Sequence, residues 1–419
     1  MKPLPSFVLS ARWILPIEGA PVENGRLLVR GGVILGIEPQ TSAPVDFALG
    51  NVAVLPGFVN AHTHLELGPI PNLEIDGYED QVSWLERVIQ QRMQTDEAAM
   101  QVQVERGITA SLAAGTTALA DITTAGRSEP GLVASALRGI VFSEVIGLKQ
   151  ARGEQTSSLA CDWLHSPEPG RSRIRRGLSP HAPYSTAGSV YENAVNQCKT
   201  LATHLAELPE ELELLACGTG RLRDFLERIN AWDPTWKPLS DHPADYLRKG
   251  ELRQADWLVA HGNYLKPADF WQFRPQAAPA DQRVTVVYCP RTSARFGHGP
   301  HPYRDMIKEG AVVCLGTDSL ASAPSLSILD EIRFLSRLNP ETEPSLLLTM
   351  GTLGGAWALR IDDEVGSLVP EKKADLAIVE LLEDGIADSD PARLVVEGNG
   401  NVVATMIDGR FVFRAYRNS

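Results

Sequence analysis

Two histidines separated by one residue, His62 and His64, end the apolar stretch LPGFVNAHTH, and histidine is scarce in this chain, with nine among 419 residues. In a strand, residues i and i+2 point to the same face. Both imidazoles can therefore bind one divalent cation, because imidazole nitrogen is a common ligand of zinc and other transition metals. A lone His-x-His pair is a weak signal, since two packed or surface histidines give the same pattern.

Further rare polar residues follow later apolar runs: His181 in SPHAPYS, His204 in THLAE, His261 in AHGN and Asp318 in GTDS. His204 and Asp318 could complete a nitrogen-and-oxygen ligand set with the first pair and leave one position for water, whose pKa a divalent metal can lower to about 7. Glu207 lies three residues after His204, where it could act as a general acid or base. A surface glutamate at the start of a helix would have the same spacing.

These polar residues lie at the ends of strand-like apolar runs, of which the chain has eight, and helix-like segments separate many of the runs. Eight strand–helix units over about 300 residues fit a (β/α)₈ barrel of the TIM type. In that fold the carboxyl ends of the strands line one mouth of the barrel, where catalytic groups lie. We therefore expect an α/β fold in which the polar residues converge at this mouth.

Both ends of the chain consist of short apolar runs separated by Gly, Pro and Asn turns. We expect residues 1–55 and 366–419 to form one small β-sandwich domain, and residues 56–365 to form the barrel. Two long connections, 208–254 and 289–303, could control pocket selectivity. The first is too long for a simple loop and could form a lid or a pocket wall.

The bulk composition restricts the kind of partner. A net charge of −13 and a pI near 5.2 disfavour nucleic acid or an anionic membrane as the main partner. No run approaches the ~20 apolar residues of a spanning helix, and the start does not read as a secretory signal. Five scattered cysteines form no CxxC pair. We expect a cytoplasmic protein that acts on a small molecule; a homodimer, the commonest oligomer, is compatible with the sequence.

Six segments, PGFVNAHTH, SPHAPYS, THLAE, AHGN, GTDS and the late KKADLAIVEL, resemble the amidohydrolase superfamily, and the resemblance covers nearly the full chain. Within it, the chain is most similar to the deaminases with one metal ion, which act on guanine, S-adenosylhomocysteine, methylthioadenosine and related aminopurines. The segments CPRTSARFGHGPHPY and GTDSLASAPSLSILDEIRF are most similar to aminodeoxyfutalosine deaminases, which act in menaquinone biosynthesis.

The resemblance implies a role for each polar residue. Glu207 would shuttle protons, His261 would hydrogen-bond the reacting water, and His181 would lie near the leaving group or the ring. One divalent metal is implied, with Zn²⁺ favoured and Fe²⁺ or Mn²⁺ also compatible with such ligands. After the seventh strand the chain departs from many relatives, since residues 289–293 read Cys-Pro-Arg-Thr-Ser in place of Asn-Pro-x-Ser-Asn. The implied metal ligands are His62, His64, His204 and Asp318.

Three more residues are candidates for contact with the substrate. Glu66 follows the histidine pair and could contact a ribose hydroxyl, or it could be a buried or solvated paired glutamate. Arg291 and His298 could reach a substrate, or they could order their Gly- and Pro-rich loop.

We therefore expect a metal-dependent hydrolytic deaminase that releases ammonia from an aminopurine nucleoside, with 6-aminodeoxyfutalosine as the favoured substrate. Asp318 would accept a proton from water, and Glu207 would protonate a ring nitrogen. One alternative is a guanine or S-adenosylhomocysteine deaminase. Another is a hydrolase of amide rings or of a chlorinated triazine; the absence of a lysine in GLSPHAPYS disfavours a two-metal amide hydrolase, and Glu207 favours deamination. A third is an inactive scaffold, against which the complete ligand set argues.

Overall fold

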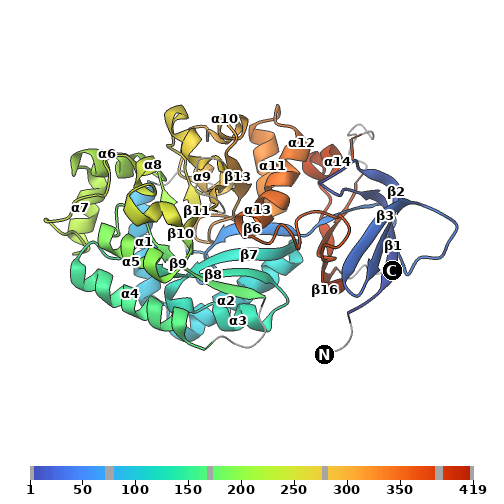
Figure 1. The fold of residues 1–419 in the computed structure, drawn as a ribbon, viewed down its shortest axis with the longest axis horizontal. Coiled ribbons are helices and arrows are strands. Elements are labelled where there is room, and N and C mark those ends of the chain that lie inside the picture. The colour runs from blue at the N-terminus through green and yellow to red at the C-terminus, as the bar shows by residue number, and fades with distance from the viewer. Residues whose placement is uncertain (1–3, 71–79, 168–172, 276–281, 383–389, 416–419) are drawn as a thin grey trace.

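Two eight-stranded sheets dominate the computed structural model (Figure 1). The structure describes residues 4–70, 80–167, 173–275, 282–382 and 390–415. The first sheet is the barrel, in which each strand pairs in parallel with the next along the chain. Its strands are β6 (Phe58–Thr63), β7 (Thr116–Thr123), β8 (Arg138–Val145), β9 (Ile174–Pro180), β10 (Thr200–Leu205), β11 (Asp256–His261), β12 (Val284–Tyr288) and β13 (Val312–Leu315).

The barrel closes where the ends of β6 and β13 meet. The backbone N–H groups of Thr317 and Asp318 both donate to the carbonyl of His62, at 3.1 and 3.0 Å. Thr63 and Asp318 also form a parallel bridge. The predicted α/β fold with a (β/α)₈ barrel is therefore confirmed.

The barrel strands are buried along almost their whole length, as expected for a parallel sheet covered by helices. Every residue of β7 is buried, for example. Small side chains such as Ala118, Ala120 and Ala202 fill part of the interior together with Leu258. This burial explains why the strands read as continuous apolar runs and why a polar residue at a strand end is conspicuous.

Helices connect the barrel strands and cover their outer faces (Figure 1). Segment 208–254, expected as a lid or pocket wall, is mostly helical, and segment 289–303 begins with one helical turn and a half. The helices are α1 (Gln81–Gln94), α2 (Glu97–Ala113), η1 (Thr124–Gly126), α3 (Glu129–Ala134), α4 (Gln150–His165), α5 (Gly188–Gln197), α6 (Pro209–Cys217), α7 (Arg221–Arg228), α8 (Pro243–Tyr246), η2 (Gly250–Gln254), η3 (Pro267–Phe273), α9 (Pro290–Arg295), α10 (Tyr303–Lys308), α11 (Ile328–Leu338), α12 (Pro344–Met350), α13 (Leu353–Ala358) and α14 (Pro391–Glu397).

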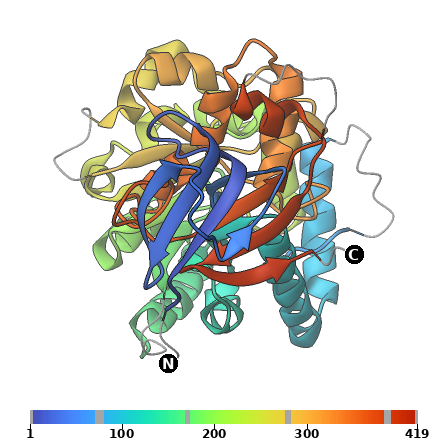
Figure 2. The ribbon, with the colours of Figure 1, turned by 90° about the vertical axis from the view of Figure 1, so that its right-hand side faces the viewer.

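The second sheet is built from both ends of the chain, as predicted, and Figure 2 shows its N-terminal and C-terminal strands side by side. Its order is β16-β15-β14-β5-β1-β2-β3, with β4 paired to β1. Most pairs are antiparallel, and β1 runs parallel to β4 and β5. The strands are β1 (Phe7–Ile14), β2 (Val22–Arg30), β3 (Val33–Pro39), β4 (Phe47–Ala48), β5 (Val52–Pro56), β14 (Leu376–Glu380), β15 (Val402–Ile407) and β16 (Arg410–Arg414).

The terminal sheet and the barrel are joined closely. Only Gly57 separates β5 from β6, and a Cβ atom at this position would lie 2.1 Å from the Thr117 side chain. The helix α14 packs on the barrel side, where Arg333 of α11 donates to the carbonyls of Val395 and Gly400 at 3.0 and 2.7 Å. Among the described helices, none combines the length and the apolar character that crossing a membrane requires.

A buried ion cluster links the base of the barrel to the terminal sheet. Arg138, at the start of β8, pairs with Asp375 at 2.8 Å and also with Asp408, and all three side chains are at most 7% exposed. The backbone N–H of Asp408 donates to Asp375 at 2.8 Å. Removing the cation would leave the buried Asp375 without its arginine partner, which is strongly destabilising, whereas Asp408 would keep its contact with Arg173.

We expect Arg138→Met to lower the free energy of unfolding by about 3–5 kcal/mol, since it breaks a buried pair from one side. Chemical denaturation followed by fluorescence measures this change. The matched control is Arg393→Met, which removes a half-exposed pair with Glu397 and should cost at most about 0.5 kcal/mol. Equal effects of the two substitutions would show that the cluster does not stabilise the junction.

Candidate metal centre

Three imidazoles converge at the mouth of the barrel. His62 lies in β6, His64 follows that strand, and His204 lies in β10. Their candidate ligand nitrogens lie within 4.8 Å of one another, and the Nε2 atoms of His64 and His204 are 3.3 Å apart. Oδ1 of Asp318 is 3.7 Å from Nε2 of both His62 and His64. The structure thus brings the four predicted ligands together at the closure of the barrel.

The protonation of the three imidazoles suits a cation. Nδ1 of His204 lies 2.9 Å from the carbonyl of His181, which can only accept, so Nδ1 carries the hydrogen and Nε2 keeps a lone pair. Nε2 of His62 is buried and has no hydrogen-bond partner among the described residues. Burial lowers the pKa of His204 to about 4 and lowers the pKa values of His62 and His64 well below their usual range. Neutral imidazoles with converging lone pairs fit a divalent metal.

Asp318 is held in an uncommon backbone conformation. Its φ of 59° lies in the left-handed region, which non-glycine residues adopt rarely and at a cost in free energy. Thr63 Oγ1 donates to its carbonyl at 3.1 Å, and Ser322 Oγ donates to Oδ2 at 2.8 Å. These contacts leave Oδ1 directed at the imidazoles. Burial raises the pKa of the carboxyl group to about 6.

Glu207 and His261 lie beside the imidazole cluster. Nε2 of His261 is 3.4 Å from Oε1 of Glu207, and Nδ1 of His261 is buried without a hydrogen-bond partner among the described residues. His261 also has a left-handed backbone, with φ at 70°. Burial, together with the charge of Asp318, raises the pKa of Glu207 well above its usual range. A carboxyl group that keeps its proton at neutral pH can serve as a general acid.

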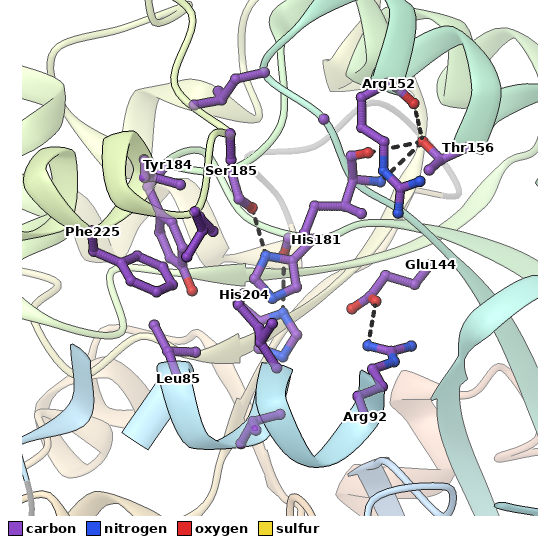
Figure 3. Close-up of a pocket in the computed structure, with 18 of the residues that line it drawn as sticks. Leu85, Arg92, Glu144, Arg152, Thr156, His181, Tyr184, Ser185, His204 and Phe225 are labelled. Carbon is purple, nitrogen blue, oxygen red and sulfur yellow. Dashed lines mark hydrogen bonds and ion pairs between the residues drawn. The ribbon is translucent and has the colours of Figure 1, made fainter. Parts of the chain in front are cut away.

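A cavity of about 630 Å³ opens over these residues, and His64, His204, Glu207, His261 and Asp318 all line it. In Figure 3, Leu85 and Phe225 lie on one side of His181, and Arg92, Glu144 and Arg152 lie on the other. The cavity therefore has an apolar wall and a charged side. The apolar wall consists of Leu85, Val88 and Ile89 of α1 with Phe225, Leu226 and Ile229 from the region of α7.

His181 lies in the cavity wall between these two sides. Its Nδ1 is 2.6 Å from Oγ of Ser185, and burial lowers its pKa to about 4. The neutral ring is positioned to contact a bound molecule, and its backbone carbonyl orients His204.

Glu66 is not among the residues that line this cavity. Its buried carboxylate pairs with Arg92 at 2.6 Å and Arg127 at 2.8 Å, and it accepts hydrogen bonds from Thr123 and Thr124. These contacts fit the alternative interpretation of a buried, paired glutamate, and a contact with a ribose hydroxyl stays a prediction.

Arg291 and His298 are the other two candidates for contact with a substrate. Neither is among the residues that line the cavity. Arg291 pairs with the buried Glu331 at 2.7 Å and donates to Ser325, which orders its loop. His298 contacts Gln81 at 2.9 Å, and Gln81 in turn donates to Glu207. Direct contact of either residue with a substrate stays a prediction.

Sequence reasoning did not identify Gln81, Arg92, Glu144 and Arg152 as part of the site. Arg92 follows Leu85 and Val88 at helical spacing in QVSWLERVIQQRM, so this face of α1 had a detectable signal. Trp84 of the same helix is buried, lines the cavity, and donates through Nε1 to the carbonyl of Ala321 at 3.0 Å.

Comparison with known proteins gives one matching family model, described as the amidohydrolase family, over residues 53–412. A curated relative from Pelotomaculum thermopropionicum, named 5-methylthioadenosine/S-adenosylhomocysteine deaminase, is 27% identical over 406 residues, which cover 90% of this chain and 85% of the relative.

Two solved structures share the fold. Aminofutalosine deaminase from Helicobacter pylori has a TM-score of 0.80 at 20% identity, with 98% of this chain and 100% of that chain covered. Atrazine chlorohydrolase from Arthrobacter aurescens TC1, solved with zinc, has a TM-score of 0.76 at 19% identity, with 97% and 95% covered. At such identities the likeness establishes the architecture alone.

Proposed function

The chain belongs to the amidohydrolase family, and from this premise we propose that it is a metal-dependent hydrolytic deaminase of an aminopurine nucleoside. The observation that carries the proposal is the meeting of His62, His64, His204 and Asp318 beside Glu207, whose raised pKa suits an acid. The name of the Pelotomaculum relative, a deaminase of two adenosine derivatives, supports this reaction class.

The chain's own residues account for the proton transfers of such a reaction. A divalent cation at this ligand set, when bound, supplies a Lewis acid that lowers the pKa of water to about 7. Asp318 accepts a proton from the attacking water while His261 orients it. Glu207 protonates the ring nitrogen next to the carbon that gains oxygen. The proton on Asp318 then passes to the exocyclic amine, the carbon–nitrogen bond breaks, and ammonia leaves. The hydroxyl proton on the same carbon returns to Glu207 as the carbonyl of the product forms.

We propose 6-aminodeoxyfutalosine as the substrate. This nucleoside carries an aryl ketone and a carboxylate beyond its ribose, so it needs both apolar surface and a cation. The cavity offers both, with Leu85 and Phe225 on its apolar wall and Arg152 among its charged groups. Arg92 and Lys149 are less available, because Arg92 pairs with two glutamates and Lys149 donates to Asn230. The fold shared with an aminofutalosine deaminase is compatible with this choice.

Ammonia release by the purified, metal-loaded protein tests the proposal. The panel is 6-aminodeoxyfutalosine, adenosine, S-adenosylhomocysteine, methylthioadenosine and guanine, with chloride release from a chlorinated triazine as a separate arm. We expect the highest kcat/KM with 6-aminodeoxyfutalosine. No ammonia from any aminopurine would sink the deaminase proposal, and chloride release alone would favour the alternative hydrolase.

The carboxylate of the substrate gives a second expected result. Replacing Arg152 by Gln should raise KM for 6-aminodeoxyfutalosine about tenfold, since a charge-assisted contact contributes roughly 1.5–3 kcal/mol. The KM for adenosine, which lacks the carboxylate, should change by less than about twofold. Steady-state kinetics with both nucleosides measure the difference. An equal change for both would remove Arg152 from substrate recognition.

A further inference from the structure

A chain of hydrogen-bonded side chains runs behind Glu207, on the side away from the cavity lining. Nε2 of Gln81 donates to Oε1 of Glu207, and Oε1 of Gln81 is 2.9 Å from Nε2 of His298. Nδ1 of His298 is 2.9 Å from the hydroxyl of Tyr264. The members come from the start of α1, from the loop after α9 and from the loop after β11. Gln81, His298 and Tyr264 are not among the residues that line the cavity.

The orientation of the Gln81 amide, with Nε2 toward Glu207 and Oε1 toward His298, fixes the direction of the other bonds in this series. The Gln81 carbonyl oxygen can only accept, so Nε2 of His298 must carry the hydrogen. In a neutral imidazole, Nδ1 then has the lone pair and accepts from the hydroxyl of Tyr264. All three donors therefore point toward Glu207. A protonated His298 would break this order, and burial, which lowers its pKa to about 4, keeps the ring neutral.

Within Glu207, the contacts of the carboxyl group fall on one oxygen. Among the described residues, both the Gln81 amide and Nε2 of His261 approach Oε1, the latter at 3.4 Å. The backbone of Glu207 is fixed as well, since its N–H donates to Glu211 and its carbonyl accepts from the Asn263 side chain, each at 2.9 Å. An oxygen that accepts from Gln81 does not carry the acid proton, which leaves Oε2 to carry it.

We infer that Gln81 and His298 are positioning residues for the general acid: they hold Oε1 of Glu207 as an acceptor, so that the transferable proton lies on Oε2, the oxygen left free to reach the substrate ring. This inference rests on the proposed function. Because α1 also supplies the apolar wall of the cavity, the same helix holds the acid and forms the binding surface. If these hydrogen bonds had a purely structural role, removing them would lower the stability of the protein and leave kcat unchanged.

The first test removes both hydrogen bonds of Gln81 at nearly constant volume. We expect Gln81→Met to lower kcat about 30-fold, a part of the roughly 10²–10⁴-fold that a positioned acid contributes, with KM changed by less than about twofold. Metal content and Tm should match the unsubstituted protein. The control is Gln90→Met, the same change on an exposed position of the same helix. In a Glu207→Gln background, Gln81→Met should cause no further loss, because the residue acts through Glu207.

The second test examines these hydrogen bonds by NMR, without measuring catalysis. ¹⁵N NMR of the metal-loaded protein, with the His298 signal assigned by its loss in His298→Asn, should show the Nε2–H tautomer. Gln81→Glu keeps the acceptor for His298 and removes the amide donor, so it should keep this tautomer and still lose activity. The inference is overturned by an Nδ1–H tautomer, by full activity of Gln81→Met, or by losses that add in the double variant. Absence of ammonia release by the unsubstituted protein would instead overturn the proposed function.

Discussion

The substitution Glu207→Gln should lower kcat about a thousandfold while the metal content stays unchanged. The substitution keeps the shape and the contacts of the side chain but removes the transferable proton, and positioned acids contribute roughly 10²–10⁴-fold to such rates. Glu207 is buried beside Asp318, and this burial raises its pKa well above its usual range, which favours the protonated form. Ammonia release under saturating substrate and elemental analysis of the same sample measure the two quantities.

The matched control for this substitution is Glu210→Gln, three residues along the chain. Among the described residues, the Glu210 carboxylate approaches Arg221 at 3.9 Å, and Glu210 does not line the cavity. Its kcat should stay within about twofold of the unsubstituted protein. Full activity of Glu207→Gln with its metal bound would exclude Glu207 as the acid.

Removing one imidazole ligand should have an effect of similar size. We propose zinc as the metal, because three neutral imidazoles and one carboxylate are ligands that zinc accepts. We expect His204→Asn to reduce the bound metal from about one ion per chain and to lower kcat about a thousandfold or more, since a Lewis acid contributes several kcal/mol. A chelator should inactivate the unsubstituted protein, and added zinc should restore its activity but not that of the variant.

The control for the ligand substitution is His165→Asn on α4, where the histidine is exposed and, within the described part of the chain, hydrogen-bonds the carbonyl of Cys161. It should retain metal and activity. Elemental analysis that finds the same metal content in His204→Asn and in His165→Asn would contradict the assignment of His204 as a ligand.

The meeting of the imidazoles could be predicted from the sequence because barrel strands are buried on both faces. A polar residue at the end of such a strand, as at His64, His204 or Asp318, stands out against an apolar background, and the topology then fixes which end of the barrel it occupies. The order of strands along the chain supplied the rest, since each strand pairs with the next.

The partners of individual charged side chains could not be predicted in the same way. Glu66 is adjacent to a predicted ligand, yet its carboxylate is engaged by Arg92 and Arg127, which lie 26 and 61 residues away. Pairing of this kind depends on how α1 and the loop after β7 pack, which periodicity does not encode. The contacts of His298 were equally hidden, because Gln81, which lies between it and Glu207, shows no motif of its own.

The seam of the barrel has a consequence for the order of events in folding. The backbone carbonyl of His62 accepts hydrogen bonds from Thr317 and Asp318, about 255 residues later. The first and last ligands along the chain therefore lie where the first and last barrel strands meet. A nascent chain that ends before β13 contains His62, His64 and His204 but lacks Asp318, so its ligand set is incomplete. A cation bound across this closure would bind the native state and not the unfolded chain, so its binding would stabilise the folded protein. We therefore expect catalytic activity only after β13, the last barrel strand, has docked, because Asp318 follows that strand.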